Sequence, residues 1–450
     1  MEKQMLRATL DAFRQRNELK VCRQEVNLTY ELGAVLKHYR NEVPILFEKV
    51  KGHRMPVAGA LFGERQAYYD MMKMTPENRL FKMMAAVASP QPVKHVTQAP
   101  VKEEIITTGI HLEKMFPIPK FHEQDSSTYI TSGIVALKDP STGKTHLSVR
   151  RLQVNGAREV SVLVASPLAR QQYAQLEAQN KPLEIAIILG YDHSLLLASQ
   201  ISSELYGVDK YEVDSALRGE ALELVSCHQI DLSVPAHAEI VLEGVMPPRK
   251  RKPEGPFGEL MGYYGGVGNH PVAEIKTVLQ RKNPIFQTAF PCREEHLSNG
   301  LIREMELYQA VNNVAKVTDV NVTVAGGCRF HAVVSLQEPN PGDAKSAILA
   351  ALGCNKDLKQ VVIVDEDINI YDPEDVELAI ATRFQASRDL VVIPEAVGSG
   401  LDPSNGIRGV SDKMGIDATA PSGEMRQKFH RAIIPGYETL DIKRYFPEEK

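Results

Sequence analysis

The middle of the chain contains seven short segments rich in β-branched residues and Leu, separated by polar or Gly- and Pro-containing stretches. Segments of this length and composition are typical of β-strands. One helical segment, ARQQYAQLEAQ, lies between the third and the fourth. Consecutive strands must bury one face of a sheet, so we expect residues 101–300 to form a mixed sheet or partly closed barrel with attached helices and a ligand pocket. The seven segments are STYITSGIVAL, HLSVRRLQV, REVSVLVA, LEIAIIL, AEIVLEG, VAEIKTVLQ and PIFQTAF.

The regions on either side of these strands are predicted to differ from them. Residues 1–100 carry Leu, Phe and Met at helical spacing and are expected to form a helical or mixed segment. Residues 301–318 contain LIREMELYQAVNNVA and are predicted to be a linking helix. Strands and helices alternate over residues 319–450, which indicates an α/β domain, and the Gly- and Pro-rich tail after Leu401 is expected to be mostly loop. The expected fold class is therefore mixed α+β, in three or four parts.

Charge and hydropathy exclude some classes of protein. The formal net charge is -5, whereas binding to the phosphates of a nucleic acid needs a basic surface, so we expect no nucleic-acid partner. The basic run Arg249 to Lys252 is flanked by prolines and is expected to be a solvated loop. No apolar stretch has the roughly 20 residues that span a bilayer, and the charged amino end is unlike a signal peptide. We therefore expect a cytoplasmic protein that does not enter a membrane.

The segment EGPFGELMGYYGG places Glu254 and Glu259 on either side of a Gly-Pro-Phe-Gly sequence. Pro256 and the glycines argue against a helix, and a straight strand would hold the two carboxylates about 16 Å apart. Gly-Pro and Phe-Gly are turn signals, so we expect the carboxylates to converge on one pocket from the two sides of a tight loop. A surface loop with two solvated acids is the alternative interpretation.

The strand segment HLSVRRLQV supplies the cation that such a pair of carboxylates needs, because Arg150 and Arg151 stand side by side in it. Neighbouring residues on a strand face opposite ways, so at most one of the two is expected to point into a given pocket. If Arg151 pairs with Glu254, the pKa of that carboxyl falls by about 1 to 3 units, while burial raises the pKa of an unpaired Glu259. This split favours acid–base chemistry near neutral pH. A buried salt bridge without chemistry is the alternative.

Together these features resemble the UbiD family of decarboxylases, which use prenylated flavin mononucleotide (FMN). The resemblance runs from about residue 100 to 425. It implies a flavin-binding domain built on a split β-barrel, a linking helix and a carboxyl-terminal dimerisation domain. It also implies a catalytic Glu-Arg-Glu network of Arg151, Glu254 and Glu259. The segments that carry the resemblance are EGPFGE followed by Gly-Tyr-Tyr, the strand with Arg151 and Gln153, ELVSCHQIDLSVPAHAEIVLEG at 223–244, and LDPSNGIRGVSDKMGIDAT at 401–419.

The resemblance further implies a cofactor site in which the flavin phosphate is held through a divalent metal, usually Mn²⁺, with a monovalent cation such as K⁺ nearby. The usual metal ligands are Asn, His and Glu, whereas this chain has His146, Gln172 and His228 near the corresponding positions. His146 and His228 are therefore candidate metal ligands. The alternative is that both donate to the phosphate directly, without a metal. The residues expected to bind the cofactor are His146, Ser148, Arg151, Gln153, Gln172 and His228.

Residues that bind the substrate are expected after the last strand segment, in PCREEHLSNGLIRE. His296 and Arg303 lie seven residues apart, which is two turns on one face if the helix includes both. An Arg fork with a His donor beside it suits a carboxylate that is not the one expelled. Ordinary charge on a helix surface is the alternative.

The resemblance implies a reversible, non-oxidative decarboxylase of an aromatic or heteroaromatic acid. A dicarboxylate substrate would explain His296 and Arg303, and furan-2,5-dicarboxylate, converted to 2-furoate and CO₂, is the expected substrate. The alternatives are an aromatic monoacid of the pyrrole-, indole- or hydroxybenzoate-carboxylate type, or a flavin-binding partner protein without catalysis. The expected partners are a flavin prenyltransferase that supplies the cofactor and further copies of this chain, in a homodimer or higher homo-oligomer.

Overall fold

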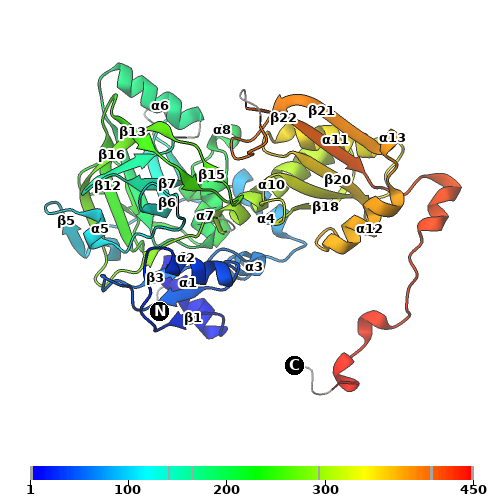
Figure 1. Ribbon diagram of the computed structural model, residues 1–450, viewed down its shortest axis with the longest axis horizontal. Helices are drawn as coiled ribbons and strands as arrows, with labels where there is room; N and C mark the ends of the chain where they lie inside the picture. Colours follow the sequence, from blue (N-terminus) through cyan, green and yellow to red (C-terminus); the bar gives the residue numbers. More distant parts are fainter. Residues whose placement is uncertain (1–3, 140–141, 165–166, 292–293, 406–408, 447–450) are drawn as a thin grey trace.

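Two bodies joined by a long helix make up the computed structural model shown in Figure 1. The structure describes residues 4–139, 142–164, 167–291, 294–405 and 409–446. A barrel with surrounding helices forms the larger body, a sheet flanked by helices forms the smaller one, and α10 (Glu294–Asn312) lies between them. Across these described ranges, none of the helices combines the length and hydropathy that crossing a bilayer requires.

The larger body is the partly closed barrel that the strand segments predict. Its strands follow the order β12-β9-β6-β7-β8-β16-β13, and the ring closes because β12 also pairs with β16. Six of the seven predicted segments supply barrel strands, and PIFQTAF contains β17 (Phe286–Gln287). The strands are β5 (Glu104–Ile106, paired with β16), β6 (Tyr129–Lys138), β7 (Thr145–Val154), β8 (Glu159–Val162), β9 (Leu183–Leu189), β12 (Ile240–Met246), β13 (Arg251–Glu254) and β16 (Gly268–Gln280).

The barrel is open along one edge of β7. Strand β7 pairs with β6 over most of its length, from Thr145 to Gln153. Its ladder with β8 covers only Leu152 to Val154. Among the strands of the described ranges, none pairs with this second edge before Leu152, so the barrel wall is open there.

The basic run Arg249 to Lys252 is not the solvated loop that its composition predicts. Its second half enters β13, and Lys250 and Lys252 both form salt bridges with Glu159. The strand forms because its backbone pairs with β16. This pairing depends on residues later in the chain, so the composition of the basic run alone does not predict it.

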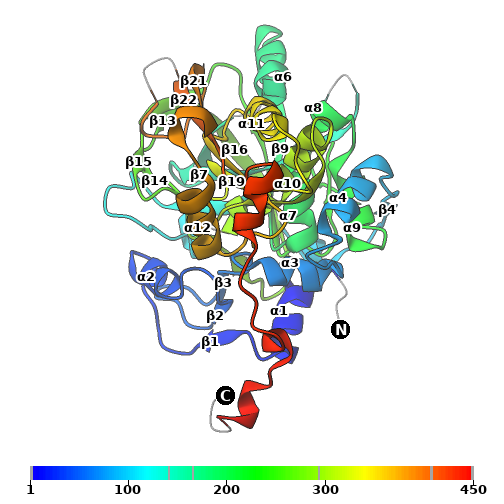
Figure 2. The same cartoon turned by 90° about the vertical axis from the view of Figure 1, so that its right-hand side faces the viewer.

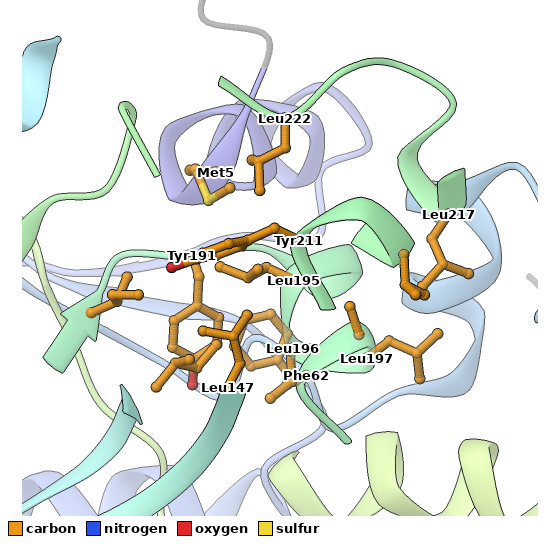
Figure 3. Close-up of a cluster of buried hydrophobic side chains, with 14 of the residues drawn as sticks. Met5, Phe62, Leu147, Tyr191, Leu195, Leu196, Leu197, Tyr211, Leu217 and Leu222 are labelled. Carbon is orange, nitrogen blue, oxygen red and sulfur yellow. The ribbon is translucent and has the colours of Figure 1, made fainter. Parts of the chain in front are cut away.

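The amino-terminal region packs on the barrel and shares its core. A small sheet of order β1-β2-β3-β17 joins three strands of this region to β17, which follows the barrel in the sequence. Figure 3 shows Met5 of the first helix beside Leu195, Leu196 and Tyr211 from two helices next to the barrel. The hydrophobic core is therefore continuous across residue 100. The strands are β1 (Lys20–Cys22), β2 (Ile45–Phe47) and β3 (Val57–Gly59), and the helices of both regions are α1 (Met5–Gln15), α2 (Glu31–His38), α3 (Arg65–Met72), α4 (Arg79–Ala88), α5 (Leu112–Met115), α6 (Pro167–Ala178), α7 (His193–Gln200), α8 (Ser203–Tyr206) and α9 (Lys210–Arg218).

The smaller body is the expected α/β domain, a five-stranded sheet of order β18-β19-β20-β22-β21. The three central strands are parallel, and the two edge strands run antiparallel to their neighbours. The expectation of a mostly loop-like chain after Leu401 is wrong in one respect, because β22 lies within that stretch, between β20 and β21. The elements are β18 (Val317–Val322), β19 (His331–Leu336), α11 (Asp343–Cys354), β20 (Gln360–Asp365), α12 (Pro373–Arg383), α13 (Ala386–Asp389), β21 (Leu390–Val397) and β22 (Val410–Asp417).

The helix between the two bodies is held by a buried carboxylate. Helix α10 begins at Glu294 and ends at Asn312, so it starts before the predicted residue 301 and stops short of 318. Its Glu304 has no exposed side-chain surface and accepts hydrogen bonds from Arg65 (3.0 Å) and Arg79 (3.2 Å) of the amino-terminal helices. Glu304 also accepts the backbone N–H of Val322 at 2.9 Å. One side chain thus connects the amino-terminal region, the linking helix and the α/β domain.

We predict that Glu304→Gln lowers the free energy of unfolding by about 3 to 5 kcal/mol, because two buried guanidinium groups lose their counter-charge. Urea unfolding followed by circular dichroism measures this change. The matched control is Glu377→Gln on the exposed face of α12, which we expect to stay within about 0.5 kcal/mol. Equal stability of the two variants would contradict a structural role for Glu304.

Candidate active site

Arg151 on β7 binds both glutamates of the predicted pair. Its Nε and Nη2 donate to Glu254 Oε1 and Oε2, each at 2.9 Å, and its Nη1 forms an ion pair with Glu259. Glu254 is fully buried, whereas 17% of the Glu259 side chain is exposed. The two carboxylates converge as predicted. The expectation that Glu259 has no contact with Arg151 is wrong, because a planar guanidinium with five donors can serve two carboxylates at once.

The sequence EGPFGELMGYYGG forms a hairpin with Glu259 in its turn. Strand β14 (Phe257–Gly258) pairs with β15 (Tyr264–Gly265) across this turn. Gly255 has φ of +91°, a conformation that favours glycine, and a Cβ there would lie 2.5 Å from the carbonyl oxygen of Gly266. A Cβ on Gly265 would lie 2.8 Å from Glu259 Oε1. The glycines are therefore what allows the second carboxylate to fold back onto Arg151.

Asp125 and Gln153 anchor this hairpin from behind. Asp125 is buried and accepts the backbone N–H of Gly258 at 2.8 Å and that of His122 at 2.9 Å. Burial acts to raise the pKa of Asp125, but the hydrogen bonds from His122 and Gly258 outweigh it and lower that pKa. Gln153 Oε1 accepts the backbone N–H of Gly255 at 2.9 Å. The structure therefore places Gln153, an expected cofactor contact, in hydrogen bonds that fix the catalytic loop.

A cavity of about 610 Å³ lies in front of Glu259 and Arg151, between the barrel and the α/β domain. Cations outnumber carboxylates among its lining side chains, so the cavity suits an anionic ligand. Its charged lining residues are Arg150, Arg151, Arg170, Glu259, Arg329, Lys356 and Asp357, and its other lining residues include Val149, Leu163, Phe257, Phe290, His296 and Asn299.

Both Arg150 and Arg151 line this cavity, which contradicts the expectation that only one of them could. The alternation of side chains along a strand assumes a sheet that continues on both sides. Here the second edge of β7 has no ladder partner in the described part of the chain before Leu152. The cavity wraps around that open edge, so side chains from both faces of β7 reach it.

A second group of polar side chains lines the cavity where α10 meets the α/β domain. His296 lies in the first turn of α10, and its Nδ1 is 3.5 Å from Arg329 Nη2. Arg329 forms an ion pair with Asp357. Arg303 donates to Glu306 at 2.7 Å and lies 3.8 Å from Asp357, but it is not among the residues that line the cavity. The structure thus pairs His296 with Arg329, not with Arg303.

The residues expected around the cofactor phosphate are spread over several elements. His146 is buried on β7, and burial together with the nearby Lys210 and Arg150 cations lowers its pKa to about 3. Ser148 follows it on the same strand and is half-buried. Gln172 on α6 is 2% exposed, and neither atom of its amide has a hydrogen-bond partner among the residues that the structure describes. His228 is exposed, and its backbone N–H donates a hydrogen bond to Glu243 Oε1 at 2.6 Å.

In the parts of the chain that the structure describes, no group of three or more His, Cys, Asp or Glu side chains is arranged to hold a metal ion. Metal binding by His146 and His228 therefore stays a prediction, and no chemical step below uses a metal.

Sequence analysis did not identify Asp125, Arg170, Arg329 or Lys356 as site residues. Arg329 follows Gly326 and Gly327, a turn between two predicted strands. Charged residues beside such turns often bind ligands, and this was the one available signal. The other three carry no local pattern that distinguishes them from surface residues.

These elements define an enzyme of the carboxy-lyase class. Residues 10–87, 94–294 and 296–418 match, in that order, the N-terminal, Rift-related and C-terminal domains of 3-octaprenyl-4-hydroxybenzoate carboxy-lyase. The chain therefore belongs to the UbiD family, and it is a UbiD-type carboxy-lyase.

Relatives of this family match nearly the whole chain. Anhydromevalonate phosphate decarboxylase of Methanosarcina mazei is 35% identical over 426 residues, which are 94% of this chain and 97% of the relative. The UbiD-class enzyme HmfF from Pelotomaculum thermopropionicum, solved in complex with FMN, is 42% identical with a TM-score of 0.95, over 98% of this chain and 99% of that one. An evolved dimeric form of HmfF in complex with prFMN is 40% identical with a TM-score of 0.90, over 98% of this chain and 100% of that one.

We predict that Asp125→Ala lowers the free energy of unfolding by roughly 2 to 4 kcal/mol, since two buried N–H groups lose a charged acceptor. Turnover should fall as well, because Gly258 directly precedes Glu259. The control is Asp231→Ala, whose side chain is 84% exposed and pairs only with Lys138. Urea unfolding and turnover are measured on both variants, and full activity of Asp125→Ala would show that this anchor does not position Glu259.

Proposed function

We propose that this enzyme uses prenylated FMN to decarboxylate, reversibly and without net oxidation, an aromatic or heteroaromatic acid. The preferred substrate in this proposal is furan-2,5-dicarboxylate, which would give 2-furoate and CO₂. The observation that carries the proposal is that one cavity has two separate polar groups along its wall, Arg151 with Glu259 on one side and His296 with Arg329 on the other.

The lining of the cavity fits a phosphorylated flavin. Arg150 and Arg170 offer donors and positive charge to a phosphate. Val149 and Leu163 offer apolar surface to a ring system, and Gly265 and Gly266 leave backbone there without side chains. The buried amide of Gln172 lacks a hydrogen-bond partner in the described part of the chain, which is consistent with a ligand that supplies one. When bound, prenylated FMN would supply an electron sink for the carbon that loses CO₂.

The three network residues take different roles because their surroundings differ. Glu254 is fully buried and bound through both oxygens, so it holds Arg151 in place. Glu259 is partly exposed and lines the cavity, so it is the residue that exchanges a proton with the substrate. Its Oε1 is engaged by Arg151, which leaves Oε2 to carry the proton. The carboxylate leaves as CO₂, and the carbon that keeps the bonding electrons receives the proton from Glu259.

We propose that His296 and Arg329 bind a second carboxylate of the substrate. Arg329 is fixed by Asp357, whose carboxyl stays ionised: burial acts to raise the pKa of Asp357, but Arg329 and Arg303 outweigh it and lower that pKa. A planar guanidinium can bind a carboxylate through two parallel hydrogen bonds, with the imidazole as a further donor. Arg303, the originally expected residue, supports this group through Asp357.

Two other substrate classes compete with the dicarboxylate. Arg329 and Lys356 would also bind the phosphate group of a phosphorylated substrate. The Methanosarcina mazei relative is named for such a substrate. A pyrrole-, indole- or hydroxybenzoate-type monoacid would leave Arg329 without an anionic partner on the substrate. Membership in a carboxy-lyase family argues against a flavin-binding protein without catalysis.

Several expectations remain part of this proposal. A flavin prenyltransferase would supply the cofactor, since prFMN is the form bound by one HmfF structure. The cytoplasm is the compartment that we propose for the enzyme. Mn²⁺ and K⁺ would sit beside the phosphate if His146 and His228 are ligands. The dimeric form of HmfF supports a homo-oligomer.

We predict that Glu259→Gln lowers decarboxylation and solvent-deuterium exchange at the ring carbon by about 10²- to 10⁴-fold, the range typical of acid–base groups. Flavin occupancy, measured by absorption of the purified holoenzyme, should not change, because the charge at Glu254 remains. Glu377→Gln is again the control. More than about a tenth of the wild-type rate in Glu259→Gln would mean that another group delivers the proton.

We predict that Arg329→Ala lowers kcat/KM for furan-2,5-dicarboxylate by up to about 10⁴-fold, because it leaves a substrate charge unpaired in the site. For furan-2-carboxylate the loss should be only about 10- to 200-fold. The control is Arg388→Ala, which removes a 62% exposed cation of α13 outside the cavity lining and should leave both rates unchanged.

Wild-type and variant enzymes are assayed with the two furan acids and with anhydromevalonate phosphate. Equal losses on both furan acids in Arg329→Ala would contradict the second carboxylate site. If the enzyme converts anhydromevalonate phosphate but not furan-2,5-dicarboxylate, the preferred substrate is the phosphate compound. Arg329 would then remain the residue that binds the anionic group.

A further inference from the structure

A histidine that the proposed mechanism does not use lies against the catalytic network. His270 Nε2 is 3.8 Å from Glu254 Oε2, the oxygen that also accepts a hydrogen bond from Arg151 Nη2 at 2.9 Å. A separation of 3.8 Å is too long for a hydrogen bond but is close enough for direct contact. The contact lies at the end of the barrel that carries β13 and α6, which both views place away from the amino-terminal helices (Figures 1 and 2). A titratable group therefore touches the buried member of the Glu-Arg-Glu network.

The pairing of β13 with β16 brings this histidine to the carboxylate. Glu254 stands directly opposite Gly268. Lys252 stands opposite His270 and is itself paired with Glu159 of β8. Residues two apart on a strand share one face, so His270 is the diagonal neighbour of Glu254 across the ladder. A Cβ on Gly268 would lie 2.6 Å from His270 Nε2, so the space for the imidazole exists because position 268 has no side chain.

A carboxylate and cations from three elements lie around the imidazole. The carboxylate is Glu254, and the cations are Lys252 of β13, Arg151 of β7 and Arg170 of α6. Burial is the largest effect on the pKa of His270 and lowers it, Glu254 acts to raise it, and the two guanidinium groups act to lower it. Because these effects together lower the pKa, the imidazole is neutral at pH 7 and takes up a proton in more acidic solution.

The two partners of this contact differ in exposure. The Glu254 side chain has no exposed surface, whereas 25% of the His270 side chain is exposed. Protons from the solvent can therefore reach the imidazole directly. Protonation of His270 would place a second cation beside a carboxylate oxygen that already has a donor from Arg151.

We propose that His270 is a positioning residue of the catalytic network. As the neutral imidazole it packs against Glu254 and leaves both carboxylate oxygens to Arg151. As the imidazolium it donates to Glu254 Oε2 in place of Arg151 Nη2, and the charge of Arg151 then turns towards Glu259. This inference rests on the proposed function, in which Glu259 delivers the proton to the substrate.

The consequence for catalysis follows from the shared guanidinium. A cation beside a carboxyl group favours the ionised form, so a closer Arg151 makes Glu259 a weaker proton donor. The group formed by His296 and Arg329 lies on other elements of the cavity wall and is not affected. Protonation of His270 should therefore lower kcat and change KM much less.

The test measures kcat and KM of the flavin-loaded enzyme as a function of pH for the wild type, His270→Gln and His270→Lys. Glutamine fills similar space without titrating, so its kcat should persist about one pH unit further into acid than that of the wild type. A lysine would place a permanent cation beside Glu254, so kcat at neutral pH should fall at least about tenfold while KM changes less than about threefold. If His270→Lys does not fold, the comparison of the wild type with His270→Gln decides.

The matched control is His237→Gln. His237 also lies beside a glutamate, at 3.0 Å from Glu223, and its side chain is 21% exposed. Glu223 begins β10 (Glu223–Ser226), which belongs to a separate three-stranded sheet. The pH profile of this variant should match that of the wild type. Circular dichroism and flavin absorption are recorded to show that each variant is folded and loaded.

Crystal structures of the wild type in acidic and in neutral solution give a readout that does not use turnover. In acid the distance from His270 Nε2 to Glu254 Oε2 should shorten to about 2.8 Å, and Arg151 Nη2 should move away from that oxygen. Unchanged distances, or the same acid limb in His270→Gln as in the wild type, would overturn the inference. If the structural change is seen but no acid is decarboxylated, the positioning role holds and the proposed function fails.

Discussion

The active site depends on one requirement, which is that the charge of the fully buried Glu254 must be compensated. An unpaired buried carboxylate would be costly, so the bidentate guanidinium of Arg151 has to lie where the loop delivers Glu254. That condition fixes the position of β7 relative to β13, and through the hairpin it fixes Glu259 as well. Glu259 then differs from Glu254 only in exposure and in the number of its contacts. The two carboxylates share one cation but differ in burial, which is the structural basis of the different roles proposed for them.

The second half of the cavity depends on a different buried charge. Glu304, bound by Arg65 and Arg79, fixes the linking helix against the amino-terminal region and against the start of β18. The first turn of that helix presents His296 to the cavity, and the domain beyond it presents Arg329. The amino-terminal region has no residue in the cavity lining, yet it determines where the α/β domain stands relative to the barrel. The parts of the site are therefore held together by a buried ion network in addition to the hydrophobic packing of the linking helix.

The charge along the cavity wall has the opposite sign to the net charge of the chain. The chain as a whole carries a formal charge of -5, but cations predominate along the cavity wall. Walls of low dielectric strengthen the field of such a group and concentrate anions there. Net charge describes the chain as a whole, and it gives no information about what a buried pocket binds. The positive lining of the pocket comes from the spatial arrangement of Arg150, Arg170 and Arg329, which lie on separate elements.

Much of the architecture could be predicted from the sequence, because its signals are local. Short β-branched segments gave the barrel strands, and helical spacing gave a linking helix, although its start at Glu294 lay outside the predicted range. Gly and Pro in EGPFGE gave the convergence of Glu254 and Glu259. These patterns act within about ten residues of sequence, through backbone sterics and the alternation of side chains. For the same reason, they could be recognised without knowing what packs against them.

The tertiary structure decided the details that depend on partners far away in the sequence. Whether Arg150 reaches the cavity depends on a missing ladder partner along the described edge of β7. Which arginine stands beside His296 depends on how the α/β domain docks, and it is Arg329, not Arg303. The central strand β22 forms because β20 and β21 pair with it on both sides. The sequence by itself determined the local elements and the tight turn that brings Glu254 and Glu259 together, while the side chains on the opposite wall of the cavity were decided by long-range packing, which leaves no local pattern in the chain.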